Sequence, residues 1–204
     1  MHGEWTNAQN LRLDLGFGFG AARSDGNIKD KGEVAFSLIK QLEKGSLGLD
    51  FAFGGTLNPY GNTNIDSVSS NEFNADPSEN RFTSIALLYR YPVGKLGYLE
   101  PRLGYSDLNR YFPIEEDRLR VSSSNLTWGL GVGVTLLERF NLSFRYQYMG
   151  RTPSYEGINT NFNIDGESID TLIRQRSASY NLFIFRVSYA IYLDKIFKPN
   201  TSSK

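Results

Sequence analysis

The residues from Leu11 to Ala21 alternate strictly between apolar side chains and positions that are polar or glycine. The odd positions hold Leu, Phe or Ala, and the even positions hold Arg12, Asp14 and three glycines. Because successive side chains of a β-strand point to opposite faces, this segment has one apolar face and one small or polar face. Residues 126–136 repeat the pattern, again with three glycines on the small face. Both segments are therefore predicted strands.

Segments of this kind recur along the chain, each close to the length of about 9 to 11 residues that a tilted membrane strand needs. The eight predicted strands are residues 10–21, 33–42, 47–57, 81–91, 97–106, 122–136, 140–149 and 178–192. The connections after the second, fourth and sixth are short, and the other four connections are long and polar. This alternation predicts an all-β fold, an eight-stranded antiparallel up-and-down transmembrane β-barrel with short periplasmic turns and four long extracellular loops.

The direction of the apolar faces distinguishes this barrel from a soluble, lipocalin-like carrier, whose apolar faces surround a ligand. In a soluble barrel Gly16, Gly18 and Gly20 would face water, where a glycine within a strand loses entropy without gaining packing. A narrow eight-stranded lumen instead has room for few large side chains, so glycines suit it. No apolar run reaches the roughly 18 residues of a membrane helix, so strands must do any spanning.

Two further runs, FNLSFRYQY at 140–148 and FIFRVSYAI at 183–191, carry the same alternation. Over residues 10–192 the chain resembles the eight-stranded outer-membrane barrels of the OmpA/OmpX type. The resemblance implies a location in the bacterial outer membrane with both termini in the periplasm. Residues 1–9 would then be a periplasmic extension and 193–204 a polar periplasmic tail. The first ten residues lack the apolar core of a signal peptide, so we expect the leader to have been removed.

Aromatic residues cluster towards the ends of the predicted strands, which indicates two girdles at the lipid interfaces. The expected short-turn girdle holds Tyr89, Tyr91, Tyr98, Phe140, Tyr189 and Tyr192. The expected long-loop girdle holds Tyr105, Tyr146, Tyr148 and Tyr180. The alternative is that these residues reflect strand propensity alone.

Charged residues on the inward faces form the main candidate site. Parity places in the lumen Arg12, Asp14, Asp50, Arg90, Glu100, Arg102, Arg145 and Arg186. Opposite charges in a poorly hydrated interior must pair, because an isolated charge there costs several kcal/mol. We predict an ion-pair plug whose positive excess is met by rim residues such as Glu33; the alternative is a gated polar path or binding site.

Parity also turns some apolar residues inward, namely Ile39, Phe82, Leu88 and Ile184, together with Tyr98, Tyr180 and Tyr192 of the expected girdles. Either the lumen is partly apolar or the register shifts at these positions.

Composition narrows the possible functions. Net charge is zero, which gives no electrostatic reason to expect nucleic acid binding, and the absence of cysteine excludes thiolate metal sites. The only histidine, His2, is far in sequence from every loop, so the histidine-dependent chemistry of barrel enzymes has no base. The acidic run at 115–117 is expected to be a solvated part of a loop. We predict a non-enzymatic protein.

One run, 161–167, begins like a calcium-binding loop, but Leu172 occupies the position that requires a bidentate Glu. Neither a metal nor another cofactor is expected.

The long loops are the expected place for specific function, because the barrel beneath them is generic. Their aromatic binding candidates are Tyr60, Phe73, Tyr111, Phe112, Tyr155 and Phe162. Such residues suit contact with a protein or glycan, or they pack the loops onto one another. We expect a surface binding or adhesion barrel surrounded by outer-membrane lipid and lipopolysaccharide. The alternatives are an accessory or structural subunit of a larger outer-membrane complex, and a narrow pore.

Overall fold

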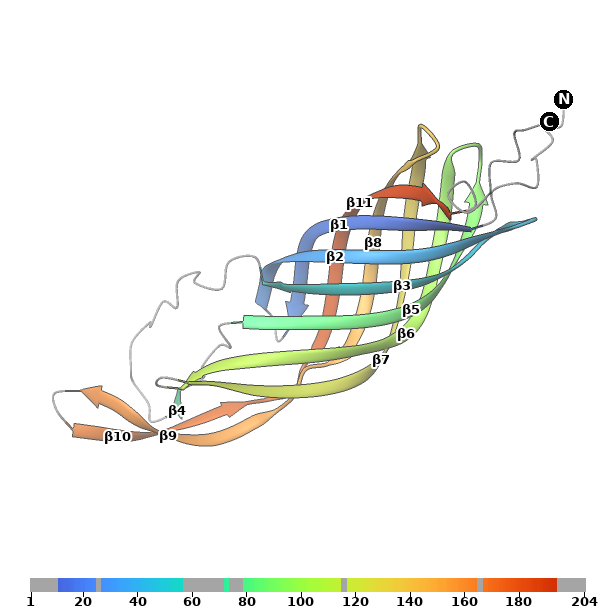
Figure 1. The fold of residues 1–204 in the computed structure, drawn as a ribbon. Coiled ribbons are helices and arrows are strands. Elements are labelled where there is room, and N and C mark those ends of the chain that lie inside the picture. The colour runs from blue at the N-terminus through green and yellow to red at the C-terminus, as the bar shows by residue number, and fades with distance from the viewer. Residues whose placement is uncertain are drawn as a thin grey trace, which may run out of the picture.

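Eight strands of the chain close into a barrel in the computed structural model (Figure 1). The structure describes residues 11–24, 27–56, 72–73, 79–114, 117–164 and 167–193. The barrel strands are β1 (Leu11–Ser24), β2 (Asn27–Leu42), β3 (Gly45–Thr56), β5 (Glu79–Val93), β6 (Gly97–Ile114), β7 (Asp117–Leu136), β8 (Phe140–Arg151) and β11 (Ser179–Tyr192). Their order is β1-β11-β8-β7-β6-β5-β3-β2, and every pairing is antiparallel. The predicted eight-stranded up-and-down barrel is confirmed.

Tight turns connect β2 to β3, β5 to β6 and β7 to β8 at one end of the barrel, as the sequence predicts. They lie at 43–44, 94–96 and 137–139. Gly94 adopts a left-handed φ of 67°, which glycine tolerates without a steric penalty. Leu137 and Glu138 also have positive φ, at 49° and 60°, and these two left-handed residues reverse the chain between β7 and β8.

At the opposite, long-loop end the strands extend farther than predicted. The β6–β7 ladder continues from Asp107↔Ser124 to Ile114↔Asp117, through residues expected to form a polar loop. The β1–β2 hairpin likewise continues to Ser24↔Asn27. The apolar alternation marks only the part of a strand whose outer face is apolar, whereas main-chain pairing continues where the outer face is polar.

A second, smaller sheet forms beyond the barrel and was not predicted. It contains β4 (Glu72–Phe73), β9 (Tyr155–Ile164) and β10 (Glu167–Gln175), in the order β4-β10-β9. Figure 1 shows β9 and β10 at the end of the molecule away from the short turns. The seventh connection is therefore long, as expected, but it contains a hairpin.

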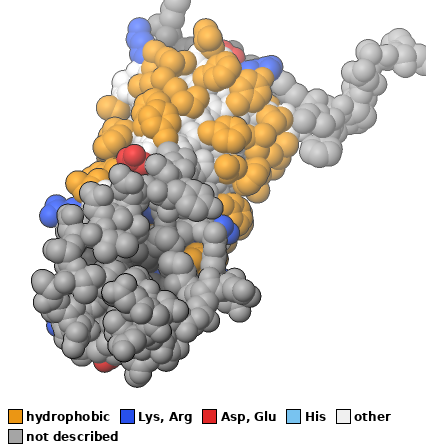
Figure 2. Space-filling model, turned by 90° about the vertical axis from the view of Figure 1, so that its left-hand side faces the viewer, with side chains coloured by type: hydrophobic (Ala, Val, Ile, Leu, Met, Phe, Trp, Pro, Cys, Tyr) orange, Lys and Arg blue, Asp and Glu red, His pale blue; other side chains and the backbone are white. Residues whose placement is uncertain are grey.

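The outer wall of the barrel is apolar. Phe17, Leu103 and Leu126 are 69%, 57% and 61% exposed, and hydrophobic side chains gather over the wall in Figure 2. Their neighbours on the same strands, such as Asp14 and Arg102, are buried inside. This arrangement is the inverse of a soluble barrel, as the glycine pattern indicates. Among the described residues, no helix has the length and apolarity to cross a membrane.

The aromatic girdles are only partly as predicted. Tyr91, Phe140 and Tyr189 are exposed on the wall near the short turns, but Tyr98 and Tyr180 are 7% and 2% exposed and lie inside. The girdle assignment of these two was wrong, because their inward parity places them in the lumen.

The exposed aromatics make polar contacts at both edges of the apolar band. Near the turns, Arg139 donates to the Tyr189 hydroxyl at 2.8 Å, a hydrogen bond that raises the pKa of Arg139. Towards the long-loop end the Tyr146 hydroxyl donates to Asn181 Oδ1 at 2.8 Å. Amphipathic rings with their polar tips bonded in this way suit the two boundaries between lipid and water.

Candidate functional site

The lumen holds a continuous network of nine charged residues, here called the charged layer. Its members are Arg12, Asp14, Glu33, Asp50, Arg90, Glu100, Arg102, Arg145 and Arg186. Five arginines and four carboxylates leave a net charge of 5 − 4 = +1 in this set. All eight residues that parity placed in the lumen are in the network, and Glu33 is the ninth.

Asp50 on β3 is the centre of the charged layer. It accepts hydrogen bonds from Arg186 at 2.7 and 3.2 Å and from Arg102 at 3.1 Å, and Arg145 Nη1 lies 3.9 Å from Asp50 Oδ2. Ser37 donates to the same carboxylate from β2. With 1% of its surface exposed, Asp50 depends on these donors, because a buried carboxylate without partners is strongly destabilising.

Glu33 bridges the two arginines that also approach Asp50. Its carboxylate accepts from Arg145 Nη2 at 2.5 Å and from Arg186 Nε at 2.6 Å. Asp50, Arg186, Glu33 and Arg145 thus form a closed ring of alternating charge. Glu33 was predicted to lie at the rim, and this depth was wrong. Its parity with Ala35 and Ser37 on β2 signals that it points inward, but parity carries no information on depth.

A second branch runs from the ring towards the short turns. Glu100 accepts from Arg102 at 2.8 Å and from Arg90 at 2.7 Å. Arg90 also donates to Asp14 at 2.8 Å, and Asp14 lies 3.1 Å from Arg12. Each interior carboxylate therefore lies against at least two arginines, which is the alternation that makes a buried charge cluster tolerable.

β7 contributes no charge to the layer and instead provides space through its glycines. A Cβ at Gly129 would lie 3.2 Å from Arg102 Cγ, and one at Gly133 would overlap the ring of Tyr98. The Gly-x-Gly-x-Gly pattern of this strand thus lets long side chains from β6 cross the lumen. This is the physical role of a pattern that superficially resembles a nucleotide-binding motif.

An apolar layer lies between the charged layer and the long-loop end. Its members, each at most 3% exposed, are Ala22, Ala35, Ala52, Phe82, Leu108, Met149, Tyr180, Leu182 and Ile184. On β11 the inward positions pass from Arg186 to Ile184, Leu182 and Tyr180 towards the long-loop end. The inward parity of Phe82 and Ile184 therefore reflects a partly apolar lumen, without a shift in register.

Two cations follow the apolar layer at the long-loop end. Lys31 Nζ donates to Thr56 Oγ1 at 2.6 Å and lies 5.8 Å from the centre of the Tyr180 ring. Arg110 donates to the carbonyls of Pro153 and Arg176 at 3.3 and 3.4 Å. The two Arg110 hydrogen bonds fix the segments on either side of the β9–β10 hairpin to the mouth of the barrel.

The loop candidates are not brought together by the described residues. Tyr111 lies on β6, half-buried, with Arg81 5.1 Å above its ring. Tyr155 begins β9 and is also half-buried. Phe73, Phe112 and Phe162 are in strands whose side chains at these positions lie outside the description, and Tyr60 lies outside the described residues altogether.

The same limit applies to the acidic run and the calcium-like run. Residues 115–116 and 165–166 lie outside the described residues, while Asp117 begins β7. In the part of the chain that is described, no group of three or more His, Cys, Asp or Glu residues could hold a metal ion.

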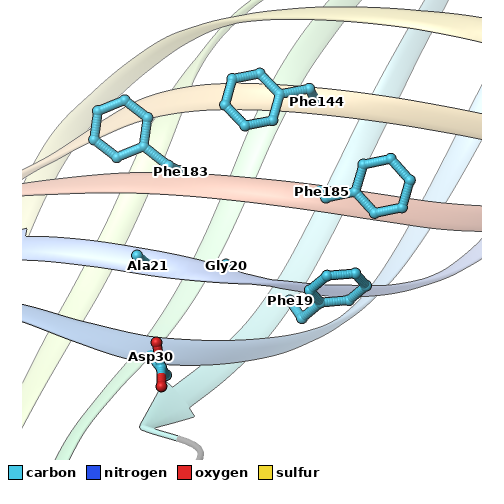
Figure 3. A pocket seen from close by; sticks show the side chains of 7 residues that line it. All are labelled: Phe19, Gly20, Ala21, Asp30, Phe144, Phe183 and Phe185. Carbon is cyan, nitrogen blue, oxygen red and sulfur yellow. The ribbon is translucent and has the colours of Figure 1, made fainter.

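A hollow of about 510 Å³ opens on the outer wall, where β1, β2, β8 and β11 lie side by side (Figure 3). Its lining residues are Phe19, Gly20, Ala21, Asp30, Phe144, Phe183 and Phe185. Four aromatic rings and one carboxylate thus surround two small residues of β1. Sequence reasoning missed this feature, because it depends on the register of four strands that are distant in the chain.

Comparison with known proteins identifies the fold. No family model matches the chain, and no curated protein matches its sequence. Among solved structures, Ail of Yersinia pestis, in complex with the heparin analogue sucrose octasulfate, is 11% identical with a TM-score of 0.55 and covers 90% of this chain and 99% of its own. A major outer membrane protein from Thermus thermophilus is 14% identical with a TM-score of 0.54, covering 89% and 99%.

A third similar structure is Neisserial surface protein A, which is 13% identical with a TM-score of 0.52 and covers 89% of this chain and 96% of its own. Identities this low establish shared architecture and leave activity open. The fold of this chain is that of the eight-stranded outer-membrane β-barrels.

Proposed function

We propose that this chain is an integral, non-enzymatic protein of the bacterial outer membrane that binds a polyanionic glycan through its long-loop end. The observation that carries the proposal is the inverted barrel itself, with an apolar wall around a lumen crossed by paired charges. Lipid and lipopolysaccharide surround such a wall. Long connections on one side and short turns on the other then place the long loops outside the cell and both termini in the periplasm.

The filled lumen argues against transport as the main activity. Arginine side chains from β5, β6, β8 and β11 reach across the barrel, and the apolar layer lies above them. An eight-stranded barrel has little space beyond its own side chains. We therefore assign the specific function to the residues at the long-loop end, which project beyond the membrane-spanning part of the barrel.

Four exposed arginines at the long-loop end, which stand among carboxylates such as the exposed Asp107 and Glu156, support a polyanionic partner. Among the side chains that the structure describes in this region, the exposed arginines apart from Arg23 beside the hollow are Arg81, Arg120, Arg151 and Arg176. Guanidinium groups bind sulfate, phosphate and carboxylate groups through charge-assisted hydrogen bonds. The sucrose octasulfate complex of Ail, which shares this fold, supports a sulfated sugar as the ligand class.

Titration of the barrel in lipid nanodiscs with sucrose octasulfate tests this function. We expect binding by the wild type that weakens as salt rises, and a loss of about tenfold or more in affinity when Arg81, Arg120, Arg151 and Arg176 are replaced by Gln, since each charge-assisted contact contributes to binding. The matched control replaces the four exposed basic residues near the short turns, Lys40, Lys44, Lys95 and Arg139, by Gln. Equal loss in both variants, or no binding by the wild type, contradicts the proposal.

A further inference from the structure

The outer faces of β5, β6 and β7 change from apolar to polar towards the long-loop end. The last apolar outward residues are Ile85, Tyr105 and Leu126, one on each strand. The outward positions that follow are Thr83, Asp107 and Ser124, and then Arg81, Asn109 and Ser122. Because the change occurs on all three strands and a lipid-facing surface is apolar, this part of the wall stands beyond the hydrocarbon region.

Two arginines on this polar face are held against β6 from its two sides. From β7, Arg120 Nε donates to Asn109 Oδ1 at 2.8 Å. From β5, the guanidinium of Arg81 lies over the ring of Tyr111, with Cζ 5.1 Å from the ring centre. Both arginines are exposed. Their charged groups thus flank residues 109–111 of β6, and an uncharged side chain of β6 restrains each one.

The amide of Asn109 is fixed between these arginines. Its Oδ1 accepts from Arg120 at 2.8 Å and from Ser122 at 2.7 Å, and the residue is only 7% exposed although it lies on the outer face. Two donors on Oδ1 leave Nδ2 as the donor of the amide, and no described residue accepts a hydrogen bond from it. The Nη groups of Arg120 likewise have no acceptor among the described residues. N–H donors therefore remain for a ligand.

A carboxylate also belongs to this face. Asp107 lies one outward position nearer the lipid than Asn109, and it accepts a hydrogen bond from Ser124. Among the described side chains on the polar outer face of β5, β6 and β7, Arg81 and Arg120 therefore outnumber the single carboxylate. Asp107 reduces the positive charge of the face without cancelling it.

We propose that Arg81, Asn109 and Arg120 bind one sulfate ester of the glycan; this inference rests on the proposed function and names the group that is recognised. A sulfate ester presents three terminal oxygens, and the donors come from three strands, with a guanidinium on either side of β6 and the amide between them. A carboxylate has two oxygens in one plane and satisfies fewer of these donors. The site therefore prefers sulfated to carboxylated sugars, and Tyr111 acts as a positioning residue for Arg81.

Two polysaccharides with the same number of negative charges per sugar test this preference. Chondroitin sulfate carries sulfate esters and carboxylates, whereas polygalacturonate carries carboxylates alone, so total charge does not separate them. Binding of each to the full chain in phospholipid nanodiscs is measured by calorimetry. We expect the wild type to bind chondroitin sulfate about fivefold more tightly than polygalacturonate. Equal affinity for the two, or a preference for polygalacturonate, overturns the sulfate assignment.

Substitution of the two arginines locates the site on the barrel. R81Q/R120Q is expected to lose about tenfold in affinity for sucrose octasulfate and to lose the preference for chondroitin sulfate, whereas K95Q/R139Q at the short turns, with the same change in charge, keeps both. If R81Q/R120Q binds as the wild type does while the fourfold arginine variant does not, this site is overturned and the proposed function stands. No binding by the wild type overturns both.

Tyr111 and Asp107 are expected to have opposite effects. Y111L removes the ring beneath Arg81 and is expected to weaken binding of sucrose octasulfate about threefold and to reduce the preference for chondroitin sulfate, whereas Y111F keeps the ring and retains both. D107N removes the neighbouring negative charge and is expected to strengthen binding about twofold at low salt. Unchanged affinity in Y111L, or weaker binding by D107N, contradicts the assignment.

Discussion

Arg186 and Asp50 meet inside the barrel through two hydrogen bonds of 2.7 and 3.2 Å, although 136 residues separate them in the chain. The two strands that carry them, β11 and β3, are not neighbours in the barrel, so the contact crosses the lumen. Side-chain pairs of this kind add specific contacts between strands whose main chains do not pair. They link the register of β3 to that of β11.

Removal of the central carboxylate is expected to be severe. Asp50→Asn leaves Arg102, Arg145 and Arg186 with an excess of buried positive charge, and loss of one partner from a buried ion pair costs about 3–5 kcal/mol. Urea unfolding of the barrel in lipid vesicles, followed by tryptophan fluorescence, measures this change in stability. Asp107→Asn is the control, because Asp107 bonds Ser124 on the exposed outer face. Similar destabilisation by both variants would contradict a stabilising charged layer.

The glycines of β7 give a second prediction with an internal control. Gly133→Ala is expected to destabilise the barrel by about 1–3 kcal/mol, because its Cβ would overlap the ring of Tyr98. Gly131→Ala is expected to be neutral, since its Cβ would lie 3.5 Å or more from its nearest neighbours. The same unfolding assay applies. Equal stability of the two variants would show that the ring of Tyr98 does not lie against Gly133 of β7.

The outer wall can be tested with a single charge. Leu130→Arg places a guanidinium on the apolar face of β7 and is expected to cost about 2–4 kcal/mol near the bilayer midplane. Leu137→Arg, at an 85% exposed position in the turn, is expected to change stability little. If Leu130→Arg folds into vesicles as stably as the wild type, position 130 does not face lipid.

Conductance measurements address the filled lumen. A single barrel in a planar bilayer is expected to give no discrete conductance steps, since ions would have to pass the paired charges and then the apolar layer that includes Phe82 and Leu182. A general porin in the same bilayer provides the positive control. Reproducible steps from the pure wild-type chain would contradict a closed lumen.

The sequence predicts which side of each strand faces lipid, because the side-chain period of two is independent of the rest of the fold. That rule places Arg102 and Arg186 inside correctly, and the same rule, followed strictly, turns Tyr98 and Tyr180 inward as well. It does not give depth along the lumen, so the central position of Glu33 could not be derived. Depth depends on the stagger between strands, which no local pattern encodes.

The parts that project beyond the membrane were the least predictable. The β6–β7 extension has polar residues on its outer face, where Arg120 and Ser122 bond Asn109, and its pairing needs no apolar alternation. The β9–β10 hairpin could not be predicted for the same reason, because its sequence lacks the strict apolar alternation of the barrel strands. The hollow at Ala21 arises from the register between β8, β11, β1 and β2, which only the closed barrel defines.

The orientation of β7 is the most direct test of the whole account. Because the chain has no cysteine, single cysteines at Leu126, Thr127, Leu130, Val132, Val134 and Thr135 can each carry one nitroxide label. Collision rates with oxygen, which concentrates in lipid, are measured for each label in vesicles. We predict high rates at 126, 130, 132 and 134 and low rates at 127 and 135. Uniform rates, or the reverse alternation, would show that the apolar face does not meet lipid.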